Sequence, residues 1–193
     1  MSKAQKTSSA RKRILETAEK LFYSEGIRSV GIDRVIAEAG VAKMTLYNHF
    51  SSKDELILEV LKYREEQFEA WIKQAMERNQ SKGMSPLQAF FASIRSWFKK
   101  ADYRGCSFIN ATAELADSRH AASQFSTEHK RRFREMLTDI IIKSEGPKAA
   151  AAAPAIHVLV EGAIVTSVCE GNAEAADIAE QAANILIAKA KRG

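Results

Sequence analysis

The sequence predicts an all-α protein, and three observations support this fold class. Apolar residues recur at helical spacing along nearly the whole chain of 193 residues. No segment of useful length alternates between apolar and polar residues with the period of two that a half-buried strand requires. Only three prolines interrupt the pattern, so long helices can form between a few turns. With 46% hydrophobic and 27% charged residues, the chain can bury a core.

The N-terminal helices are predicted to be short. The first ends at Gly26 and carries an apolar face formed by Ile14, Leu15, Ala18, Leu21 and Phe22. The second covers residues 32–39 and ends at Gly40, and a third follows over residues 42–49. These three helices predict a helical domain at the N-terminus.

A longer helix is predicted after Ser52. Apolar residues from Leu56 to Met76 indicate about 25 residues, roughly 40 Å at 1.5 Å per residue. Ser52 is expected to cap this helix, with Glu55 completing a capping box. Ser85 is expected to cap the next one. Further helices are predicted over residues 105–117, 120–144, 154–170 and 173–191.

Excess positive charge is concentrated at the N-terminus. Residues 1–53 contain ten of the 29 Lys and Arg residues but only five of the 24 Asp and Glu residues, so the net charge of +5 lies in this segment. Such a concentration raises the encounter rate and the affinity for phosphate backbones. We therefore expect a polyanionic partner for this segment, and a solvated basic tail is the competing interpretation.

Residues 32–49 have the dimensions of a helix-turn-helix, in which the second helix enters the major groove of DNA. Val41, Leu46 and Phe50 are the expected inward anchors. Five outward side chains suit phosphates and base edges, namely Lys43, Thr45, Tyr47, Asn48 and His49. Lys53 adds a positive charge at the start of the next helix, whose N-terminal amides offer another phosphate site.

The segment GIRSVGIDRVIAEAGVAKMTLYNHFSSKDELI resembles the DNA-binding domain of the TetR family of bacterial transcriptional regulators. The resemblance covers residues 11–60. It rests on Phe22, Gly26, Ala39-Gly40-Val41, Thr45-Leu46-Tyr47, Phe50 and Lys53-Asp54-Glu55-Leu56 in order without gaps. It implies that residues 42–49 form the recognition helix. By the same resemblance, Thr45, Tyr47 and Lys53 chiefly hold phosphates, while Lys43, Met44 and His49 lie at or near the bases.

Three positions depart from the common family pattern. Gly31 stands where the family usually has a Ser or Thr that caps the second helix and contacts phosphate. The backbone amide of Gly31 is therefore expected to make that contact. Ala42 and Asn48 also differ from the usual residues, which leaves the base preference open.

The resemblance further implies a larger C-terminal domain that binds a small-molecule effector and forms a homodimer. The expected domains are residues 1–52 for DNA binding and residues 53–193 for effector binding and dimerisation. The segment RGCSFINATAELAD resembles one subgroup of the family. The implied target is a near-palindromic double-stranded DNA operator, and the implied function is a repressor released by its effector.

The effector contacts are expected around a helix rich in Phe and Trp. An apolar pocket could be lined by Phe90, Phe91, Trp97, Phe98 and Phe108. Asn110 and Glu114 lie one helical turn apart and are the expected polar contacts, because a buried polar pair needs a partner. His129 and Phe133 are weaker candidates. The competing interpretation is that these aromatic residues only form the core.

The dimer interface is predicted on the last two helices, where apolar faces carry small residues that permit close packing. The residues assigned to it are Ile156, Val160, Ala163, Ile164, Ser167, Ile178, Ala182, Ile185 and Leu186. A charge introduced at Ile164 is expected to split the dimer.

The sequence lacks the common catalytic motifs, including G-x-S-x-G, H-E-x-x-H, the P-loop and G-x-G-x-x-G. We therefore predict no enzyme, no catalytic residue, no cofactor and no metal. A metal sensor that uses Cys106 with His120 or His129 is one alternative, and a non-specific nucleoid-type or protein-interaction module is another. The two cysteines are expected to be reduced thiols in a cytoplasmic protein. No apolar stretch is judged long enough to span a membrane.

Overall fold

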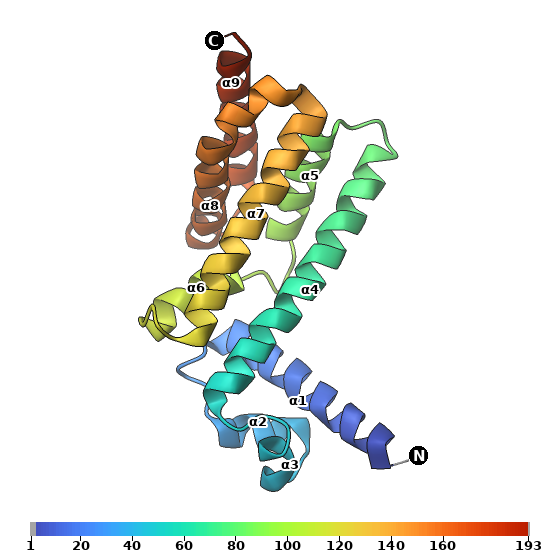
Figure 1. The fold of residues 1–193 in the computed structure, drawn as a ribbon, viewed down its shortest axis with the longest axis vertical. Coiled ribbons are helices and arrows are strands. Elements are labelled where there is room, and N and C mark those ends of the chain that lie inside the picture. The colour runs from blue at the N-terminus through green and yellow to red at the C-terminus, as the bar shows by residue number, and fades with distance from the viewer. Residues whose placement is uncertain (1–2, 193) are drawn as a thin grey trace. The chain divides into compact units, whose positions relative to one another are not determined.

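The computed structural model describes the backbone of residues 3–192 and the side chains of residues 9–192. Within these residues every regular element is helical (Figure 1), which confirms the all-α prediction. The elements are α1 (Lys3–Glu25), α2 (Ile32–Ala39), α3 (Lys43–Tyr47), α4 (Lys53–Gln80), α5 (Pro86–Phe98), α6 (Ser107–Leu115), α7 (Ala121–Glu145), η1 (Pro147–Ala152), α8 (Ala153–Glu170) and α9 (Glu174–Arg192). Two of the basic residues behind the predicted polyanionic partner, Lys3 and Lys6, have side chains outside the described residues.

The chain forms two compact units that do not follow the order of the sequence. Unit 1 comprises residues 1–67 and 107–128, and unit 2 comprises residues 68–106 and 129–193. Helix α6 therefore belongs to the unit that contains the N-terminal helices, although it lies in the C-terminal half of the sequence. The domain boundary predicted after residue 52 stays a prediction.

The core of unit 1 consists of the apolar faces predicted for the N-terminal helices. The five apolar residues predicted for the first helix are all buried. Leu46 of α3 and Phe50, which follows it, are 0% exposed, and burial of such side chains contributes about 1.5 to 3 kcal/mol each. After α2, Gly40 adopts a left-handed conformation with φ 61° and ψ 45°. This glycine turns the chain from α2 towards α3.

Ion pairs join α1 to α4 within unit 1. Arg11 donates a hydrogen bond to Glu59 Oε2 at 2.5 Å, and Arg64 donates to Glu19 Oε1 at 2.5 Å. The guanidinium of Arg64 also lies over the Tyr23 ring, 4.0 Å from its centroid. Ion pairs and a cation–π contact thus connect α1, which precedes the helix-turn-helix, to α4, which follows it.

Serine residues cap α4 and α5, but only one cap forms as predicted. Ser52 Oγ accepts a hydrogen bond from the Glu55 N–H at 3.1 Å. The Glu55 carboxylate instead accepts from the Ser51 N–H at 2.7 Å, so the capping box predicted at Ser52 is half formed because Ser51 takes the carboxylate. At α5, Ser85 and Gln88 make the full reciprocal pair.

Aromatic side chains form much of the core of unit 2. Their ring centroids lie 5.2 to 6.4 Å apart, mostly in the tilted and edge-on arrangements that aromatic pairs prefer. We call this group the aromatic cluster: Phe68, Trp71, Phe90, Phe91, Trp97, Phe98, Tyr103 and Phe133. Because the rings contact one another, they act at least as core residues.

A charged group also lies within unit 2. Lys130 of α7 donates to both carboxylate oxygens of Glu161 of α8, at 2.9 and 2.7 Å, and to the sulfur of Cys106 at 3.3 Å. Burial acts to raise the pKa of Glu161, but the imidazole of His157 and the Lys130 ammonium outweigh burial and hold that pKa below its usual value. Glu161 is therefore ionised at neutral pH and links α8 to α7.

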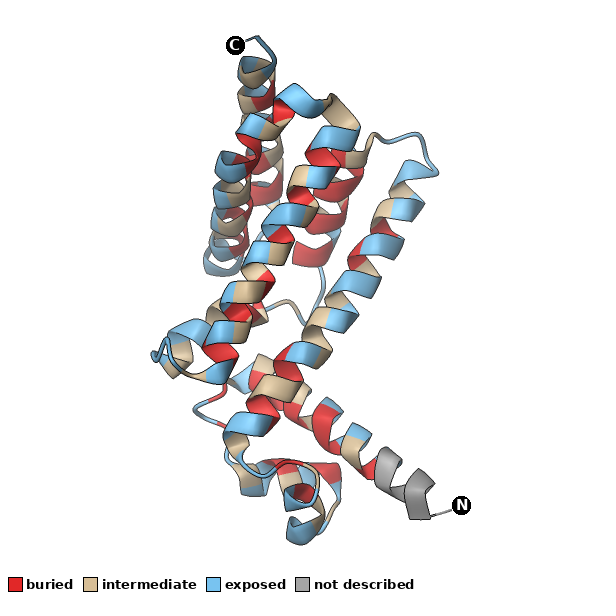
Figure 2. Ribbon diagram, in the orientation of Figure 1, coloured by how far each residue is buried: buried red, intermediate tan, exposed pale blue. Residues whose placement is uncertain are grey.

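The buried face of α8 corrects the predicted dimer interface. Five residues that the sequence analysis assigns to that interface are buried inside unit 2, namely Ile156, Val160, Ala163, Ile164 and Ser167. That assignment is therefore wrong for these residues. The other side of α8 exposes Val158, Val165 and Val168, with exposed fractions of 68%, 48% and 46%. Figure 2 shows buried and exposed residues alternating along this helix.

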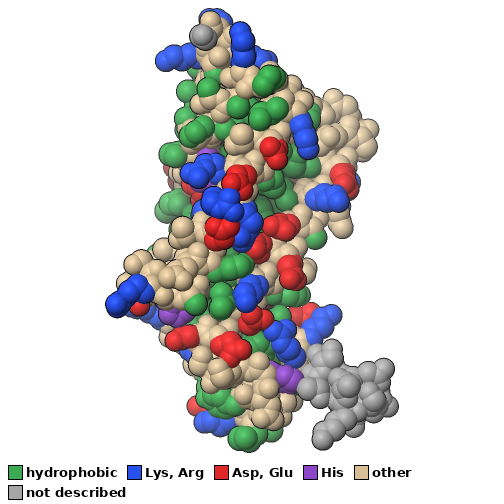
Figure 3. Space-filling view, viewed as in Figure 1, with side chains coloured by type: hydrophobic (Ala, Val, Ile, Leu, Met, Phe, Trp, Pro, Cys, Tyr) green, Lys and Arg blue, Asp and Glu red, His purple; other side chains and the backbone are tan. Residues whose placement is uncertain are grey.

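On α9, two of the predicted interface residues are exposed. Ile178 and Ile185 are 66% and 71% exposed, while Ala182 and Leu186 are half-buried. Hydrophobic side chains are also visible on the surface over the C-terminal helices (Figure 3).

Residues 147–170, which include η1 and α8, are long and apolar enough to cross a membrane, contrary to the expectation from sequence. About 39% of the most apolar window is buried inside the fold. Core helices of globular proteins reach the same length and composition, so this segment is weak evidence for a membrane.

Candidate nucleic-acid interface

The helix-turn-helix forms at the predicted residues, with a recognition helix shorter than predicted. Helix α3 covers Lys43–Tyr47, its N-cap is Ala42 and its C-cap is Asn48. Leu46 anchors it from the inside. The N–H groups of Asn48 and His49 bond to the carbonyls of Met44 and Leu46 at 3.0 and 2.9 Å, so the turn beyond the helix is ordered by backbone hydrogen bonds.

The predicted DNA contacts around α3 lie on its outer surface. Lys43, Met44, Tyr47 and Asn48 are exposed, and Met44 is 69% exposed. Lys43 Nζ lies 3.6 Å from Asp33 Oδ1, and both side chains are largely exposed. Such a surface ion pair contributes about 0 to 1 kcal/mol, so Lys43 can turn towards another partner at little cost.

Two further predicted contacts, Thr45 and His49, are half-buried. The His49 ring lies edge-on to the ring of Phe50 with centroids 6.4 Å apart. Packing against an anchor residue limits the directions that the imidazole can take.

Gly31 occupies the N-cap of α2, as the resemblance implies. It has φ −78° and ψ 157°, and no side chain caps the helix. Its carbonyl accepts from the Val35 N–H at 3.3 Å. A Cβ atom at this position would have no neighbour within 4 Å, so the backbone is unobstructed where the family has its phosphate contact.

Lys53 differs from the other predicted contacts because its ammonium faces the protein. Lys53 Nζ donates to the carbonyl oxygen of Ile27 at 2.6 Å and lies 5.9 Å from the centroid of the Phe22 ring. Burial lowers the pKa of Lys53, partly opposed by Asp54 and Glu114. The phosphate contact predicted for Lys53 stays a prediction.

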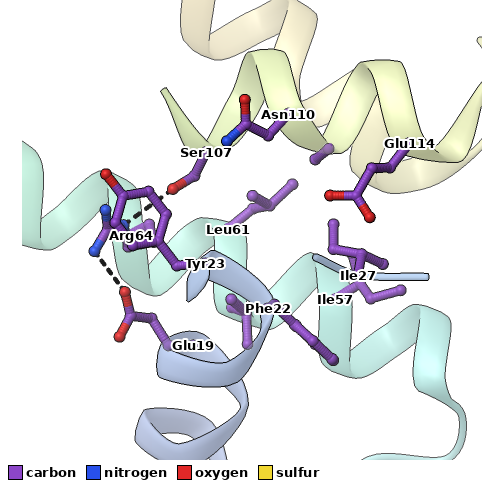
Figure 4. A pocket seen from close by; sticks show the side chains of 12 residues that line it. Glu19, Phe22, Tyr23, Ile27, Ile57, Leu61, Arg64, Ser107, Asn110 and Glu114 are labelled. Carbon is purple, nitrogen blue, oxygen red and sulfur yellow. Dashed lines mark hydrogen bonds and ion pairs between the residues drawn. The ribbon is translucent and has the colours of Figure 1, made fainter. Parts of the chain in front are cut away.

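A small cavity of about 20 Å³ lies within unit 1 between α1, α4 and α6 (Figure 4). Its lining includes two predicted effector contacts, Asn110 and Glu114, together with Phe22, Ile57 and Leu61. This volume is roughly that of a site for one water molecule, which is too small for an effector. The cavity is therefore a feature of how α6 packs on α1 and α4.

The aromatic residues predicted to contact the effector do not line this cavity. Phe108 is buried, and its ring centroid lies 6.4 Å from that of Phe125 in unit 1. Trp97 belongs to the aromatic cluster of unit 2, 5.4 Å from Phe68 and 5.2 Å from Tyr103. Asn110 and Glu114 share a cavity, while Phe108 and Trp97 pack into separate groups.

Sequence reasoning missed several residues that support α6. Arg64 of α4 donates to Ser107 Oγ at 3.2 Å, and the Arg28 N–H donates to Glu114 Oε2 at 3.0 Å. Arg28 also reaches the carbonyl of Leu115 through its guanidinium at 3.4 Å. No periodic pattern marks these pairs, because their partners are 43 to 87 positions apart.

Neither cysteine has the surroundings of a metal ligand. Cys106 is buried and contacts Lys130, whereas Cys169 is exposed. Across the described part of the chain, no three His, Cys, Asp or Glu side chains gather in a way that could hold a metal ion. Near the start of α7, His120 lies 3.5 Å from Asp54.

Two family models match the chain. Residues 14–60 match the model for bacterial regulatory proteins of the tetR family, and residues 83–182 match the C-terminal domain of LmrA/YxaF-like transcriptional regulators. The chain belongs to the TetR family. The resemblance drawn from the helix-turn-helix motif is confirmed.

Solved structures of TetR-family regulators agree with this assignment. A TetR-family regulator from Streptomyces coelicolor is 32% identical, with a TM-score of 0.82 over 95% of this chain and 96% of its own. A tetR-type regulator from Streptomyces avermitilis is 25% identical, with a TM-score of 0.73 over 91% of this chain and 98% of its own.

The curated relatives match over shorter segments. YxaF from Bacillus subtilis, an HTH-type transcriptional regulator, is 31% identical over 48% of this chain and 49% of its own length. FasR from Mycolicibacterium smegmatis, an HTH-type transcriptional activator, is 34% identical over 44% of this chain and 40% of its own length. The matched segment thus spans half or less of these relatives. This chain is a transcriptional regulator of the TetR family, which is not a family of enzymes.

Proposed function

We propose that the protein is a homodimeric repressor in the cytoplasm that binds a near-palindromic DNA operator and is released by a small-molecule effector. The observation that carries the DNA-binding part is the outer surface of α3. It presents Lys43, Met44 and Tyr47 to solvent above a single buried anchor, Leu46. A short helix with an exposed mixed surface can enter the major groove without disturbing the core.

The DNA contacts divide into two groups in this proposal. Lys43, Met44 and His49 read base edges, with Asn48 at the end of the helix beside them. Thr45, Tyr47 and the backbone amide of Gly31 hold phosphates, because hydroxyl groups and amides commonly bind phosphate oxygens. Lys53 contributes positive charge to this surface, while its ammonium bonds to the Ile27 carbonyl.

The homodimer is proposed to form through an exposed apolar stripe on α8 and α9, two helices that pack against each other. The stripe consists of Val158, Gly162, Val165, Ile178 and Ile185. Several exposed apolar residues on two helices that pack together favour a protein partner. The stripe is self-complementary in chemistry, as an interface related by a two-fold axis requires.

Gly162 supports a second copy of the chain as the occupant. A glycine inside a helix costs about 1 kcal/mol relative to alanine, yet a Cβ atom at Gly162 would have open space around it in one protomer. No contact within one protomer therefore requires a glycine at position 162. A helix from a second copy that approaches closely would require it.

The effector is proposed to be an apolar or amphipathic compound that binds in unit 2 next to the aromatic cluster. Trp97 is one of the predicted contacts that belong to this cluster, and aromatic side chains commonly line small-molecule sites. Asn110, Glu114 and Phe108 lie in unit 1, so we propose that they act on the DNA-binding unit and do not contact the effector directly.

The sign of regulation rests on family analogy. FasR, which matches part of this chain, is an activator, so the sign needs its own measurement. A promoter fused to a reporter should be silent when the protein is present and active when its gene is deleted. Reporter activity that requires the protein would identify an activator.

The operator can be tested by selecting bound duplexes from the DNA that flanks the gene for this protein. We expect enrichment of a near-palindrome whose half-sites lie about 34 to 36 Å apart or somewhat more. Equal binding of the selected and random duplexes would instead support a non-specific nucleic-acid-binding module.

A further inference from the structure

The peptide group between Ile27 and Arg28 is bound from both sides. Its carbonyl oxygen accepts a hydrogen bond from Lys53 Nζ at 2.6 Å, and its N–H donates to Glu114 Oε2 at 3.0 Å. An ammonium and a carboxylate thus lie at the two ends of one peptide dipole. Hydrogen bonds with one charged partner are roughly twice as strong as neutral ones. We call this arrangement the peptide clamp.

The backbone next to the clamp is shaped to admit the carboxylate. Gly26 has φ +93°, a conformation that favours glycine. A Cβ atom at Gly26 would also lie 3.0 Å from Glu114 Oε2 and 3.3 Å from Oε1. A side chain at this position would therefore strain the backbone, and the Glu114 carboxylate would have to shift by a few tenths of an ångström to make room. Figure 4 shows the Glu114 carboxylate directed towards the segment that contains Ile27.

The clamp involves three segments of unit 1. The clamped peptide lies in the turn between α1 and α2, Lys53 is the first residue of α4, and Glu114 lies in the last turn of α6. Arg28 strengthens the link to α6 because its guanidinium donates to the Leu115 carbonyl at 3.4 Å. At the other end of α6, Ser107 is held by Arg64 at 3.2 Å.

The surroundings of the clamp act on the Lys53 charge in opposite directions. The partial burial of Lys53 disfavours its charge, and the negative charges of Asp54 and Glu114 oppose that effect. Replacement of Glu114 would therefore remove one of the two carboxylates that favour the charged form of Lys53. Loss of one partner is expected to loosen the contact made by the other.

We propose that Glu114 is a positioning residue for DNA binding. Glu114 holds the Ile27–Arg28 peptide opposite Lys53 and so sets the path of the chain from α1 into α2. The orientation in which α2 and α3 meet DNA therefore depends on the position of α6. Glu114 itself does not touch DNA. This inference rests on the proposed DNA-binding function, and it gives a role to a residue that the sequence analysis assigned to the effector.

The proposal makes a prediction of unusual sign. Removal of a carboxylate from a DNA-binding protein normally leaves DNA affinity unchanged or raises it, because repulsion of phosphates decreases. Replacement of Glu114 should instead lower DNA affinity, because the turn before α2 loses its fixed geometry. Electrostatics and positioning therefore predict opposite results.

The test compares Glu114→Ala, Glu114→Gln and the control Glu66→Gln, which removes an exposed carboxylate from the same unit. The probe is a mixed-sequence duplex of about 30 base pairs at about 50 mM salt, where non-specific binding is strong. Fluorescence anisotropy should show a loss of at least about fivefold for Glu114→Ala. Glu114→Gln should lose less because its amide oxygen still accepts from Arg28, and Glu66→Gln should bind at least as tightly as the wild type.

A second measurement separates the clamp from DNA binding. Amide exchange at Arg28 should be faster in Glu114→Ala than in the wild type and in Glu66→Gln, and thermal melting checks that each variant is folded. If Glu114→Ala fails to fold, Glu114→Gln provides the comparison.

The two ways of failing are distinguishable. A folded Glu114→Ala or Glu114→Gln protein that binds the duplex as tightly as the wild type would overturn the positioning role alone. A wild-type protein that binds no duplex would overturn the proposed DNA-binding function, whatever the exchange rate at Arg28.

Discussion

Helices α3 and α8 both expose apolar side chains, but the neighbours of those side chains differ. The five-residue α3 buries only Leu46, and it exposes Met44 beside Lys43 and Tyr47. The eighteen-residue α8 has one fully buried apolar side and exposes three valines on another. A surface that mixes apolar, aromatic and cationic groups suits the grooves of DNA. A continuous apolar surface suits a protein partner.

Adjacent residues of α8 provide the strongest test of this difference. Ile164 is 3% exposed and Val165 is 48% exposed. Ile164→Glu should unfold the protein or destabilise it by at least about 3 to 5 kcal/mol, because it buries an unpaired charge. Chemical denaturation followed by circular dichroism measures this loss.

Val165→Glu should keep the fold but split the dimer, because the new charge lies in the exposed stripe. Sedimentation at micromolar concentration should give a folded monomer for Val165→Glu and a dimer for the wild type. A folded monomer produced by Ile164→Glu, together with a Val165→Glu protein that stays dimeric, would restore the interface first predicted from the sequence.

The two helices also explain why the sequence predicts one surface and not the other. Around α3, anchors such as Leu46 and Phe50 alternate with polar residues, so the inward side is identifiable. Apolar residues occur on all sides of α8. Their helical spacing therefore predicts a helix but does not indicate which of its sides packs against the core. The helices themselves end within about two residues of most predicted boundaries, a common uncertainty at helix ends.

The role of Glu114 shows a second limit of prediction from sequence. The spacing of Asn110 and Glu114 leads to their assignment as polar effector contacts, whereas the structure shows both lining a cavity too small for an effector. The partner of Glu114 is the N–H of Arg28, 86 positions earlier in the chain. Every residue except proline has a backbone N–H, so the sequence does not mark which of them has a carboxylate as its partner. A carboxylate that binds a backbone N–H therefore looks the same in the sequence as one that binds a ligand.

Within α3, Leu46 and Met44 should respond differently to truncation. Leu46→Ala should cost about 2 to 5 kcal/mol of unfolding free energy, because it leaves a cavity at a fully buried site. Met44→Ala should change stability by less than about 0.5 kcal/mol but weaken discrimination between base pairs. Urea denaturation and binding to single-mismatch duplexes measure the two effects. Equal stability losses for both variants would contradict the assigned orientation of α3.

On α8, Glu161 should make stability depend on pH. Its pKa is below the usual value in the folded protein, so its contribution is present above the unfolded pKa of about 4.3 and is lost as pH falls through the folded value. Glu161→Gln should therefore destabilise the protein by about 1.5 to 3 kcal/mol at pH 7, and the difference should disappear in acid. Urea denaturation from pH 7 to pH 3 tests this. A difference that stays constant over that range would indicate a loss of packing and not of charge.

Lys43 should contribute to specificity more than to general affinity. Its weak pairing with Asp33 leaves it available, and a lysine on a guanine edge contributes about 1 to 3 kcal/mol of discrimination. Lys43→Ala should lower affinity for operator and leave affinity for random duplex nearly unchanged, as measured by anisotropy at several salt concentrations. Were Lys43 bound to a phosphate, all duplexes would weaken equally and the salt slope would fall by about 0.9.

The smallest expected effect is at Gly31, the N-cap of α2. Its φ of −78° and ψ of 157° are accessible to any residue, and a Cβ atom would meet no neighbour within 4 Å. Gly31→Ser should therefore stabilise the protein by a few tenths of a kcal/mol, because the hydroxyl can accept from an unpaired N–H in the first turn of α2. It should also raise affinity for operator and random duplexes alike, since a hydroxyl at this position binds phosphate and reads no base.

Gly31→Ala is the matched control, because it adds the Cβ atom without the hydroxyl. Equal DNA affinity for the serine and alanine variants would mean that a hydroxyl at this position adds no phosphate contact to the one proposed for the backbone amide of residue 31.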